Sequence, residues 1–206
     1  MQSVPDNIEV FHHGDIDEVA EIFRNELPDD FCSLLGSGFL RGYFLPHFLA
    51  TDPHIGYVAR HDGRVVGFSL AARASGYYSN FIKNNFMGLS IYSLLACLRD
   101  IRRTGYFLDV LKVMFGSDAF RPFDDDLELL YLSVDSSHQG TGVGGRLVDK
   151  ALQEGQQLGF NRCVLKTFPS VEGIQRFYLR CGFEPLHLNQ GRIWYSKSLP
   201  ALKPSV

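Results

Sequence analysis

The residues whose types and spacing best indicate chemistry lie in a short glycine-rich stretch, residues 136–147, with the sequence SSHQGTGVGGRL. Four glycines follow a glutamine there, and the stretch contains no acidic residue. A glycine-rich turn that opens a helix offers unpaired N–H groups and the positive end of the helix dipole, and together these bind phosphate. The stretch therefore predicts a backbone that closely approaches a phosphate group.

Two nucleotide-binding patterns fit part of this stretch. Gly140, Gly142 and Gly145 fit the dinucleotide fingerprint G-x-G-x-x-G. That fold places its turn directly after a strand and an acidic residue about 20 residues later. Here residues 135–139 separate the strand from the glycine turn, and the later segment VLKTFPS has no acidic residue. Both observations argue against a dinucleotide site. A P-loop needs Lys and then Ser or Thr where this chain has Arg146 and Leu147.

A third pattern, Q-x-x-G-x-G, fits Gln139, Gly142 and Gly144 and is typical of the loop that binds the pyrophosphate of acyl-CoA. All three patterns rely on the same N–H groups and helix dipole, so the stretch alone does not choose among them. The elements around it must decide.

The bulk composition indicates one globular domain. The chain has 206 residues, of which 45% are hydrophobic and 21% charged. Its formal net charge of −3 gives no basic field, which argues against nucleic acid as a partner. The four cysteines are far apart and form no C-x-x-C, so we expect reduced thiols, no metal site and a cytoplasmic protein. The N-terminus has no signal-peptide pattern. The longest uncharged run, residues 84–98, is shorter than the ~18 residues of a membrane span.

The periodicity predicts an α/β protein with a mixed sheet. Strands are expected at residues 8–12, at both arms of a hairpin over 55–75 with a turn at 61–63, at 127–135, at 162–168, and in a closing hairpin over 183–198. Helices are expected at 16–23, in an interrupted region over 29–50, from the glycine loop to about 159, and at 172–180. Residues 77–126 break this rhythm and indicate a helical insertion between the third and fourth strands. The order implies antiparallel hairpins and one parallel crossover.

Two segments in this order carry a family resemblance. LYLSVDSSHQGTGVG, followed by RFYLRCGF with its F-Y-x-x-x-G-F pattern, resembles the GNAT superfamily of acyl-CoA-dependent N-acyltransferases. The resemblance implies a single GNAT-like three-layer α/β/α domain over 1–206. It also implies an enzyme that transfers an acetyl or other short acyl group from acyl-CoA to a primary amine, without a metal.

The resemblance also assigns residues to the cofactor. The main-chain N–H groups of the loop would bind the CoA pyrophosphate, the strand residues would pair along the pantetheine, and Phe177 stands beside Tyr178 in the second motif. The cofactor-binding residues expected on this basis are Leu132, Ser133, Val134, Gln139, Gly140, Thr141, Gly142, Val143, Gly144 and Phe177. The chain departs from the family at Val171, where Asn is common, and at Ser136, near which Pro is common.

Attack of an amine on a thioester needs a base for the amine, a donor for the oxyanion and an acid for the leaving thiolate. Glu128 is the candidate base, because strict alternation places it with Leu130, Leu132 and Val134 on one apolar strand face and Tyr131 on the other. A carboxylate on such a face is unusual unless it meets water or a partner. The alternative is a strand-end acid near the surface.

Tyr178 is the candidate acid, since by resemblance it lies near the thioester sulfur. The alternative is a core tyrosine whose hydroxyl is hydrogen-bonded. By the same resemblance, a main-chain N–H near Val134 would stabilise the oxyanion. His138 in the loop could contact a phosphate, although a solvated loop histidine is the simpler interpretation.

The acceptor is expected opposite CoA, over residues 31–48 and the insertion. The run FCSLLGSGFL at 31–40, followed by a long insertion, looks like family members of polysaccharide biosynthesis. With Arg99, Arg102, Arg103 and Arg121 in the insertion, this suggests a nucleotide-linked amino sugar. The insertion has three alternative roles: a helical pair that covers an apolar face of the sheet, a homodimer contact or a peripheral membrane contact. A protein or peptide amine acetyltransferase and a non-catalytic acyl-CoA sensor are alternatives for the whole chain.

Overall fold

The structure, a computed structural model, describes residues 7–99, 126–167, 172–189 and 192–200. Within these residues one sheet of seven strands has the order β1-β2-β3-β4-β5-β7-β6. The strands are β1 Asn7–Val10, β2 His54–His61, β3 Arg64–Arg73, β4 Asp126–Val134, β5 Arg162–Thr167, β6 Glu184–Asn189 and β7 Arg192–Ser198. Neighbours are antiparallel except β4 and β5, which are parallel. The predicted hairpins and single parallel crossover are confirmed.

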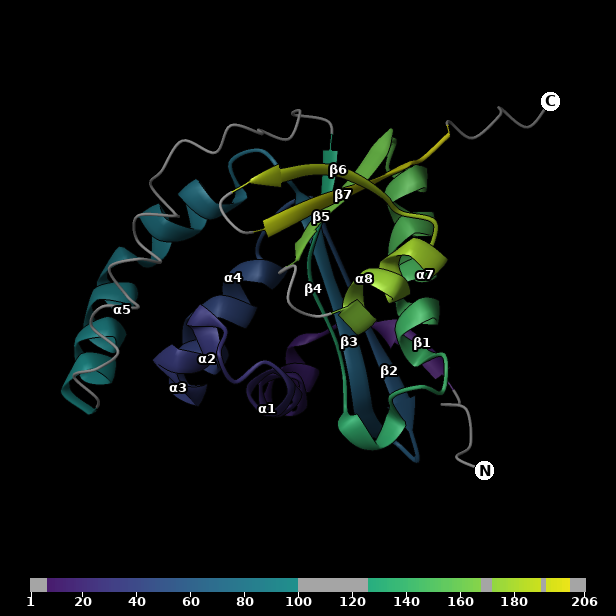
Figure 1. Cartoon of the computed structure of the whole chain (residues 1–206). Helices are drawn as coiled ribbons and strands as arrows, with labels where there is room; N and C mark the ends of the chain where they lie inside the picture. The colour runs from purple at the N-terminus through teal and green to yellow at the C-terminus, as the bar shows by residue number, and fades with distance from the viewer. Residues whose placement is uncertain (1–6, 100–125, 168–171, 190–191, 201–206) are drawn as a thin grey trace.

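Helices cover both faces of the sheet, as Figure 1 shows, so the predicted three-layer arrangement is confirmed. On one side are α1 Ile16–Glu26, α2 Phe31–Leu35, α3 Ser37–Phe39, the π-helix η2 Leu40–Phe44, α4 Leu45–Leu49 and α5 Tyr77–Arg99. On the other are α7 Val143–Gln157 and α8 Glu172–Arg180. The short 3₁₀ helices η1 His13–Asp15 and η3 Ser136–His138 precede α1 and the glycine loop.

Each face of the sheet has its own hydrophobic core. The core under α1–α5 is aromatic, and Phe23 on α1 stacks on Phe68 of β3 with ring centroids 5.8 Å apart. The core under α7 and α8 is largely aliphatic and includes Leu127, Leu129 and Val148. Burial of this apolar surface on both sides holds β4 at the centre of the sheet.

A β-bulge in β4 changes which side chains face which core. Leu70 of β3 pairs with Tyr131 and Ala71 pairs with Leu129, which leaves Leu130 as an extra residue. Leu130 and Tyr131 both pack in the aromatic core, whereas Leu132 packs under α7. An inserted residue reverses the faces of all residues after it.

The alternation predicted for β4 is therefore wrong. Glu128 lies between Leu127 and Leu129, which face α7, so Glu128 faces the aromatic side with Tyr131 rather than Leu132 and Val134. Tyr131 was expected on the opposite face from Glu128 and is on the same one. The sequence of β4 alternates well enough to conceal the extra residue.

The strands β4 and β5 pair over a short distance. Among the described residues, their ladder joins only 126–128 to 162–164, and its last rung is Glu128 with Val164. β5 nevertheless continues to Thr167 against β7, and β4 continues to Val134 against β3. A gap therefore opens between β4 and β5 directly after Glu128.

The insertion begins as the long helix α5, which lies between β3 and β4 as predicted. Residues 100–125, with Arg102, Arg103 and Arg121, lie outside the described residues, and so does Val171; the side chain of Arg99 is likewise not described. The arrangement expected for these arginines therefore stays a prediction.

α5 corrects the expectation that no segment is long and apolar enough to span a membrane. Its residues Asn80–Leu98 meet that length and composition, and only 17% of the window is buried. The uncharged run identified from the sequence begins after Lys83, whereas the 19-residue apolar segment of the helix includes Lys83. Length and composition alone do not distinguish a membrane span from a helix of a soluble domain.

Candidate active site

A cleft of about 1170 Å³ lies between the second half of β4, the glycine loop, the start of α7 and α8. Most of the predicted cofactor-binding residues line it, together with Tyr178. These lining residues are Leu132, Ser133, Val134, Gln139, Gly140, Gly142, Gly144, Phe177 and Tyr178. Two motifs about 35 residues apart in the sequence thus form one cleft.

Three predicted residues do not line this cleft. Val143 is buried and packs against Val66 and Leu147, so its side chain anchors α7. The hydroxyl of Thr141 donates to the carbonyl oxygen of His138 at 2.7 Å, which braces the loop. Glu128 faces the other side of the sheet.

The glycine loop is held closed by a contact that sequence reasoning missed. The Gln139 side-chain amide donates to the carbonyl oxygen of Val134 at 2.9 Å and to Glu26 Oε2 at 3.1 Å. Glu26 Oε1 accepts from the main-chain N–H of Ser136 at 2.9 Å. Gln139 therefore shapes the loop with its side chain, which leaves main-chain N–H groups as the candidate phosphate-binding groups of the loop. No sequence signal links Glu26 on α1 to this loop.

Two glycines in the loop adopt a conformation that other residues avoid. Gly140 has φ 78° and Gly142 has φ 90°, and Gly142 is the residue that caps the N-terminus of α7. The N–H groups of the first turn of α7 point out of the helix end, where the helix dipole is positive. A third glycine, Gly144, lets α8 approach, since an added Cβ would lie 3.3 Å from the Phe177 ring.

Replacing Gly142 by alanine is expected to weaken acetyl-CoA binding about 5- to 30-fold, because a left-handed backbone costs a non-glycine residue ~1–2 kcal/mol. The Kd from isothermal titration calorimetry would measure this. Gly42→Ala is the matched control, since Gly42 is helical and an added Cβ would meet no heavy atom within 4 Å. Equal Kd values for the two variants would show that the Gly142 backbone does not shape the site.

Tyr178 extends into the cleft from α8 and packs among aromatic rings. Its ring centroid lies 5.1 Å from Phe177, 5.8 Å from Phe183 and 6.4 Å from Tyr195. Burial raises the pKa of Tyr178 above its ordinary value of 10.0. The phenol therefore keeps its proton at neutral pH and can act as a proton donor.

Glu128 is fully buried, with 3% of its side chain exposed, and has two partners. Its Oε1 lies 3.1 Å from Lys166 Nζ on β5 and accepts from the Tyr78 hydroxyl at 3.4 Å. The surface position that was the alternative for Glu128 is therefore wrong. Glu128 and Tyr178 lie on opposite faces of the sheet, and Glu128 is the last residue of β4 that pairs with β5.

A comparison with protein-family models identifies the family of this chain. The model of the Acetyltransferase (GNAT) family matches residues 17–183, most of the chain. The chain belongs to the GNAT acetyltransferase family. It is an N-acetyltransferase that takes an acyl group from CoA, and the resemblance stated from the two motifs is confirmed. No curated protein matches its sequence.

Solved structures show the same fold at low sequence identity. One similar structure is the PaiA N-acetyltransferase of Thermoplasma acidophilum in complex with coenzyme A, with a TM-score of 0.60 and 12% identity over 93% of this chain and 98% of that chain. Another is the ribosomal-protein-S18-alanine N-acetyltransferase of Escherichia coli, with a TM-score of 0.58 and 11% identity over 97% of each chain. A third is the phosphinothricin acetyltransferase of Sinorhizobium meliloti in complex with AcCoA. Its TM-score is 0.59, and the identity is 11% over 94% of this chain and 88% of that chain.

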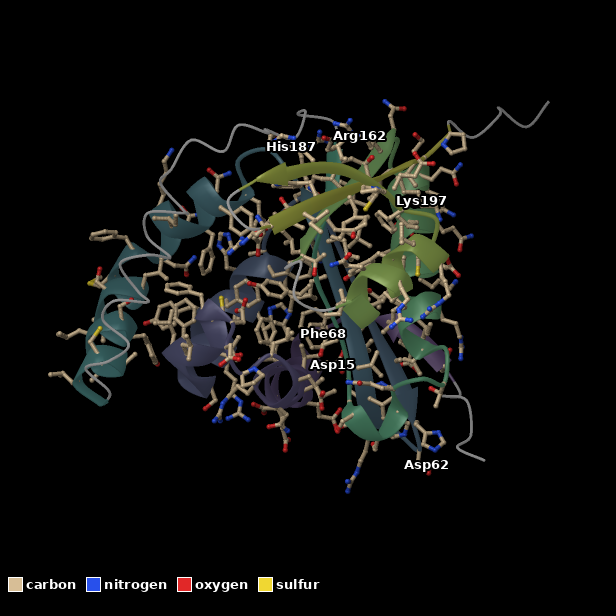
Figure 2. The ribbon with its side chains drawn as sticks, in the orientation of Figure 1. Asp15, Asp62, Phe68, Arg162, His187 and Lys197 are labelled. Carbon is tan, nitrogen blue, oxygen red and sulfur yellow. The ribbon has the colours of Figure 1, made fainter. Side chains whose placement is uncertain are left out.

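In this GNAT chain, two cationic side chains line the cleft. Arg180 and Lys197 both line it, and Lys197 Nζ donates to the carbonyl oxygen of Cys181 at 2.7 Å (Figure 2). Glu26 and Asp149 also line the cleft, so its walls are mixed in charge. The two cations were not predicted, because Arg180 occupies a variable position of the F-Y-x-x-x-G-F pattern and Lys197 lies outside both motifs.

The opposite face of the GNAT sheet carries a partly buried polar pair, Asp30 and Tyr131, that the sequence did not reveal. The Tyr131 hydroxyl donates to Asp30 at 3.4 Å, and Asp30 Oδ1 also accepts the N–H of Cys32 at the start of α2. Burial raises the pKa of Asp30 and also that of Tyr78. Tyr131 thus packs in the aromatic core and also places its hydroxyl within hydrogen-bonding distance of Asp30.

Proposed function

We propose that this acetyltransferase transfers an acetyl or other short acyl group from acyl-CoA to the primary amine of a small molecule. The donor would lie in the cleft, with its pyrophosphate on the N–H groups of the loop and its pantetheine along residues 132–134. Glu128 would be the base and Tyr178 the acid. The observation that supports the proposal is that Glu128 is the last β4 residue paired with β5, while Tyr178 lines the cleft beside residues 132–134 on the opposite face of the sheet.

The pantetheine pairing is supported by the short β4–β5 ladder. Because β4 separates from β5 after Glu128, the following residues have a strand edge available on that side. An extended amide-containing chain can pair with such an edge as an added strand does. The thioester carbon would then lie near the point of separation, between Glu128 and Tyr178.

The proposed reaction is direct transfer. Glu128 takes a proton from the acceptor ammonium, the amine nitrogen attacks the thioester carbon, and a main-chain N–H near Val134 stabilises the oxyanion. The C–S bond breaks, Tyr178 gives its proton to the sulfur, and the nitrogen loses its second proton to solvent, from which Tyr178 is reprotonated. General acid and base catalysis of this kind contributes ~10²–10⁴-fold each.

The acceptor side carries acids and cations together, since Lys166 pairs with Glu128 and Arg192 acts on Asp30. Glu128 and Asp30 are acids on the aromatic face of the sheet, where they lie near the hydroxyls of Tyr78 and Tyr131. Carboxylates beside aromatic rings recognise an ammonium group. A nucleotide-linked amino sugar is the first amine to test, on the resemblance of FCSLLGSGFL and on the arginines of the insertion.

The donor is tested by thermal unfolding with acetyl-CoA, with NAD and ATP as controls. Acetyl-CoA at about 100 times its Kd is expected to stabilise the protein by ~2.7 kcal/mol and to raise Tm. A rise with NAD or ATP alone would contradict the donor assignment. Binding of acetyl-CoA without turnover on a broad amine panel would favour an acyl-CoA sensor, and turnover on peptides alone would favour a peptide acetyltransferase.

A further inference from the structure

One primary amine of the protein itself is held against the proposed base. Lys166 lies on β5 two residues after Val164, the last rung of the β4–β5 ladder. It therefore stands on the far side of the gap from β4. Its Nζ nevertheless reaches across to Glu128 Oε1, at 3.1 Å.

Two aromatic rings complete the surroundings of this amine. Lys166 Nζ lies 4.4 Å from the centroid of the Tyr78 ring and 5.3 Å from that of Trp194. A carboxylate with two ring faces is the chemistry that binds an ammonium group. Lys166 is 23% exposed and is thus partly shielded from solvent.

The proposed function requires the ammonium of the acceptor to meet Glu128, because Glu128 must take its proton. Lys166 already makes that contact. It also lies beside the gap that the thioester of the donor would enter. The protein therefore keeps an amine of its own in the place of the acceptor.

We propose that Lys166 is a self-acetylation site, which accepts the acyl group when acyl-CoA is bound and no acceptor amine is present. This inference rests on the proposed function. Glu128 takes one proton from the Lys166 ammonium, and the freed nitrogen forms an amide bond with the thioester carbon. The C–S bond breaks, the sulfur leaves as a thiol with the proton of Tyr178, and the nitrogen loses its second proton to solvent, from which Tyr178 is reprotonated; Glu128 then releases the proton it took. The products are acetyl-Lys166, CoA and one released proton.

The experiment is incubation of the purified full chain with acetyl-CoA alone, followed by intact mass and peptide mapping. We expect one acetyl group per chain, on Lys166, at a rate that does not change with protein concentration. Lys83 on α5 and Lys150 on α7 are exposed and report uncatalysed acetylation in the same sample. Uncatalysed reaction would favour these exposed amines over the shielded Lys166.

Two variants keep the result interpretable. Lys166→Arg retains a cation beside Glu128 and should remove the acetyl group. Glu128→Gln should slow labelling of Lys166 by ~10²–10⁴-fold and leave the labelling of Lys83 and Lys150 unchanged. Labelling of Lys166 at the same rate in Glu128→Gln as in the wild type would overturn the proposal.

The failure of this inference is distinguishable from the failure of the proposed function. Acetyl groups on Lys83 and Lys150 but not on Lys166, in a sample whose Tm rises with acetyl-CoA, would overturn self-acetylation and leave the donor site standing. Absence of both the Tm rise and the label would overturn the donor site and the inference with it.

Discussion

Tyr178→Phe is expected to lower kcat by ~10²–10⁴-fold with no change in the Kd of acetyl-CoA. The variant removes only the hydroxyl and keeps the ring that packs on Phe177 and Phe183. Without the phenol, the sulfur must leave as a thiolate or take a proton from water. Steady-state kinetics with a thiol reagent for released CoA would measure kcat, and calorimetry would measure Kd.

Tyr195→Phe is the matched control for this variant. Tyr195 lies in the same aromatic cluster as Tyr178, is buried, and does not line the cleft. Its variant should keep kcat. Equal losses in both variants would mean that the hydroxyl of Tyr178 acts through packing, as in the alternative of a core tyrosine.

The pH profile gives a second test of Tyr178. Burial raises its pKa above 10.0, so the acid form persists through the neutral range and is lost only as pH rises above that value. The phenol should therefore produce no alkaline decline of kcat below pH 10. A decline near pH 8 that disappears in Tyr178→Phe would contradict this assignment.

Glu128→Gln is expected to lower kcat by ~10²–10⁴-fold, because a neutral amide cannot take the proton of the acceptor. The residual rate should rise with pH towards ~10.4, the ordinary pKa of a lysine-like amine, as the acceptor loses its proton to solvent. Rates on the best amine of the panel, measured across pH, would show this. A wild-type pH profile in the variant would mean that another group is the base.

The same change should also destabilise the fold, since Glu128 is buried beside Lys166. Removing one charge of a fully buried pair costs ~3–5 kcal/mol. Lys166 is 23% exposed, so solvent screening reduces the expected loss to ~1–3 kcal/mol, measured by chemical denaturation.

Glu154→Gln is the matched control for Glu128→Gln. Glu154 Oε2 on α7 accepts from the Tyr57 hydroxyl at 3.3 Å, much as Glu128 accepts from Tyr78, and Glu154 does not line the cleft. The control should keep kcat. A similar loss of activity in both variants would indicate a general effect of losing a carboxylate–tyrosine contact.

The sequence by itself determined the glycine loop and the elements on either side of it. The glycines indicated a turn that opens a helix, and Gly140 and Gly142 in that turn have positive φ. Phosphate binding by such a turn depends on main-chain N–H groups that are adjacent in sequence, so a local pattern contains most of the information. The strand before the loop, the helix after it and the aromatic pair at Phe177 and Tyr178 were predicted for the same reason.

Only the tertiary structure decided the face to which Glu128 points and what it meets there. The bulge at Leu130 is visible only in how β4 pairs with β3, and no residue type in β4 predicts it. The partners of Glu128 come from α5 and β5, and those of Gln139 include Glu26, 113 residues away. Contacts between distant segments depend on how whole elements pack, so a periodic pattern places a residue on a strand and leaves its neighbours undetermined.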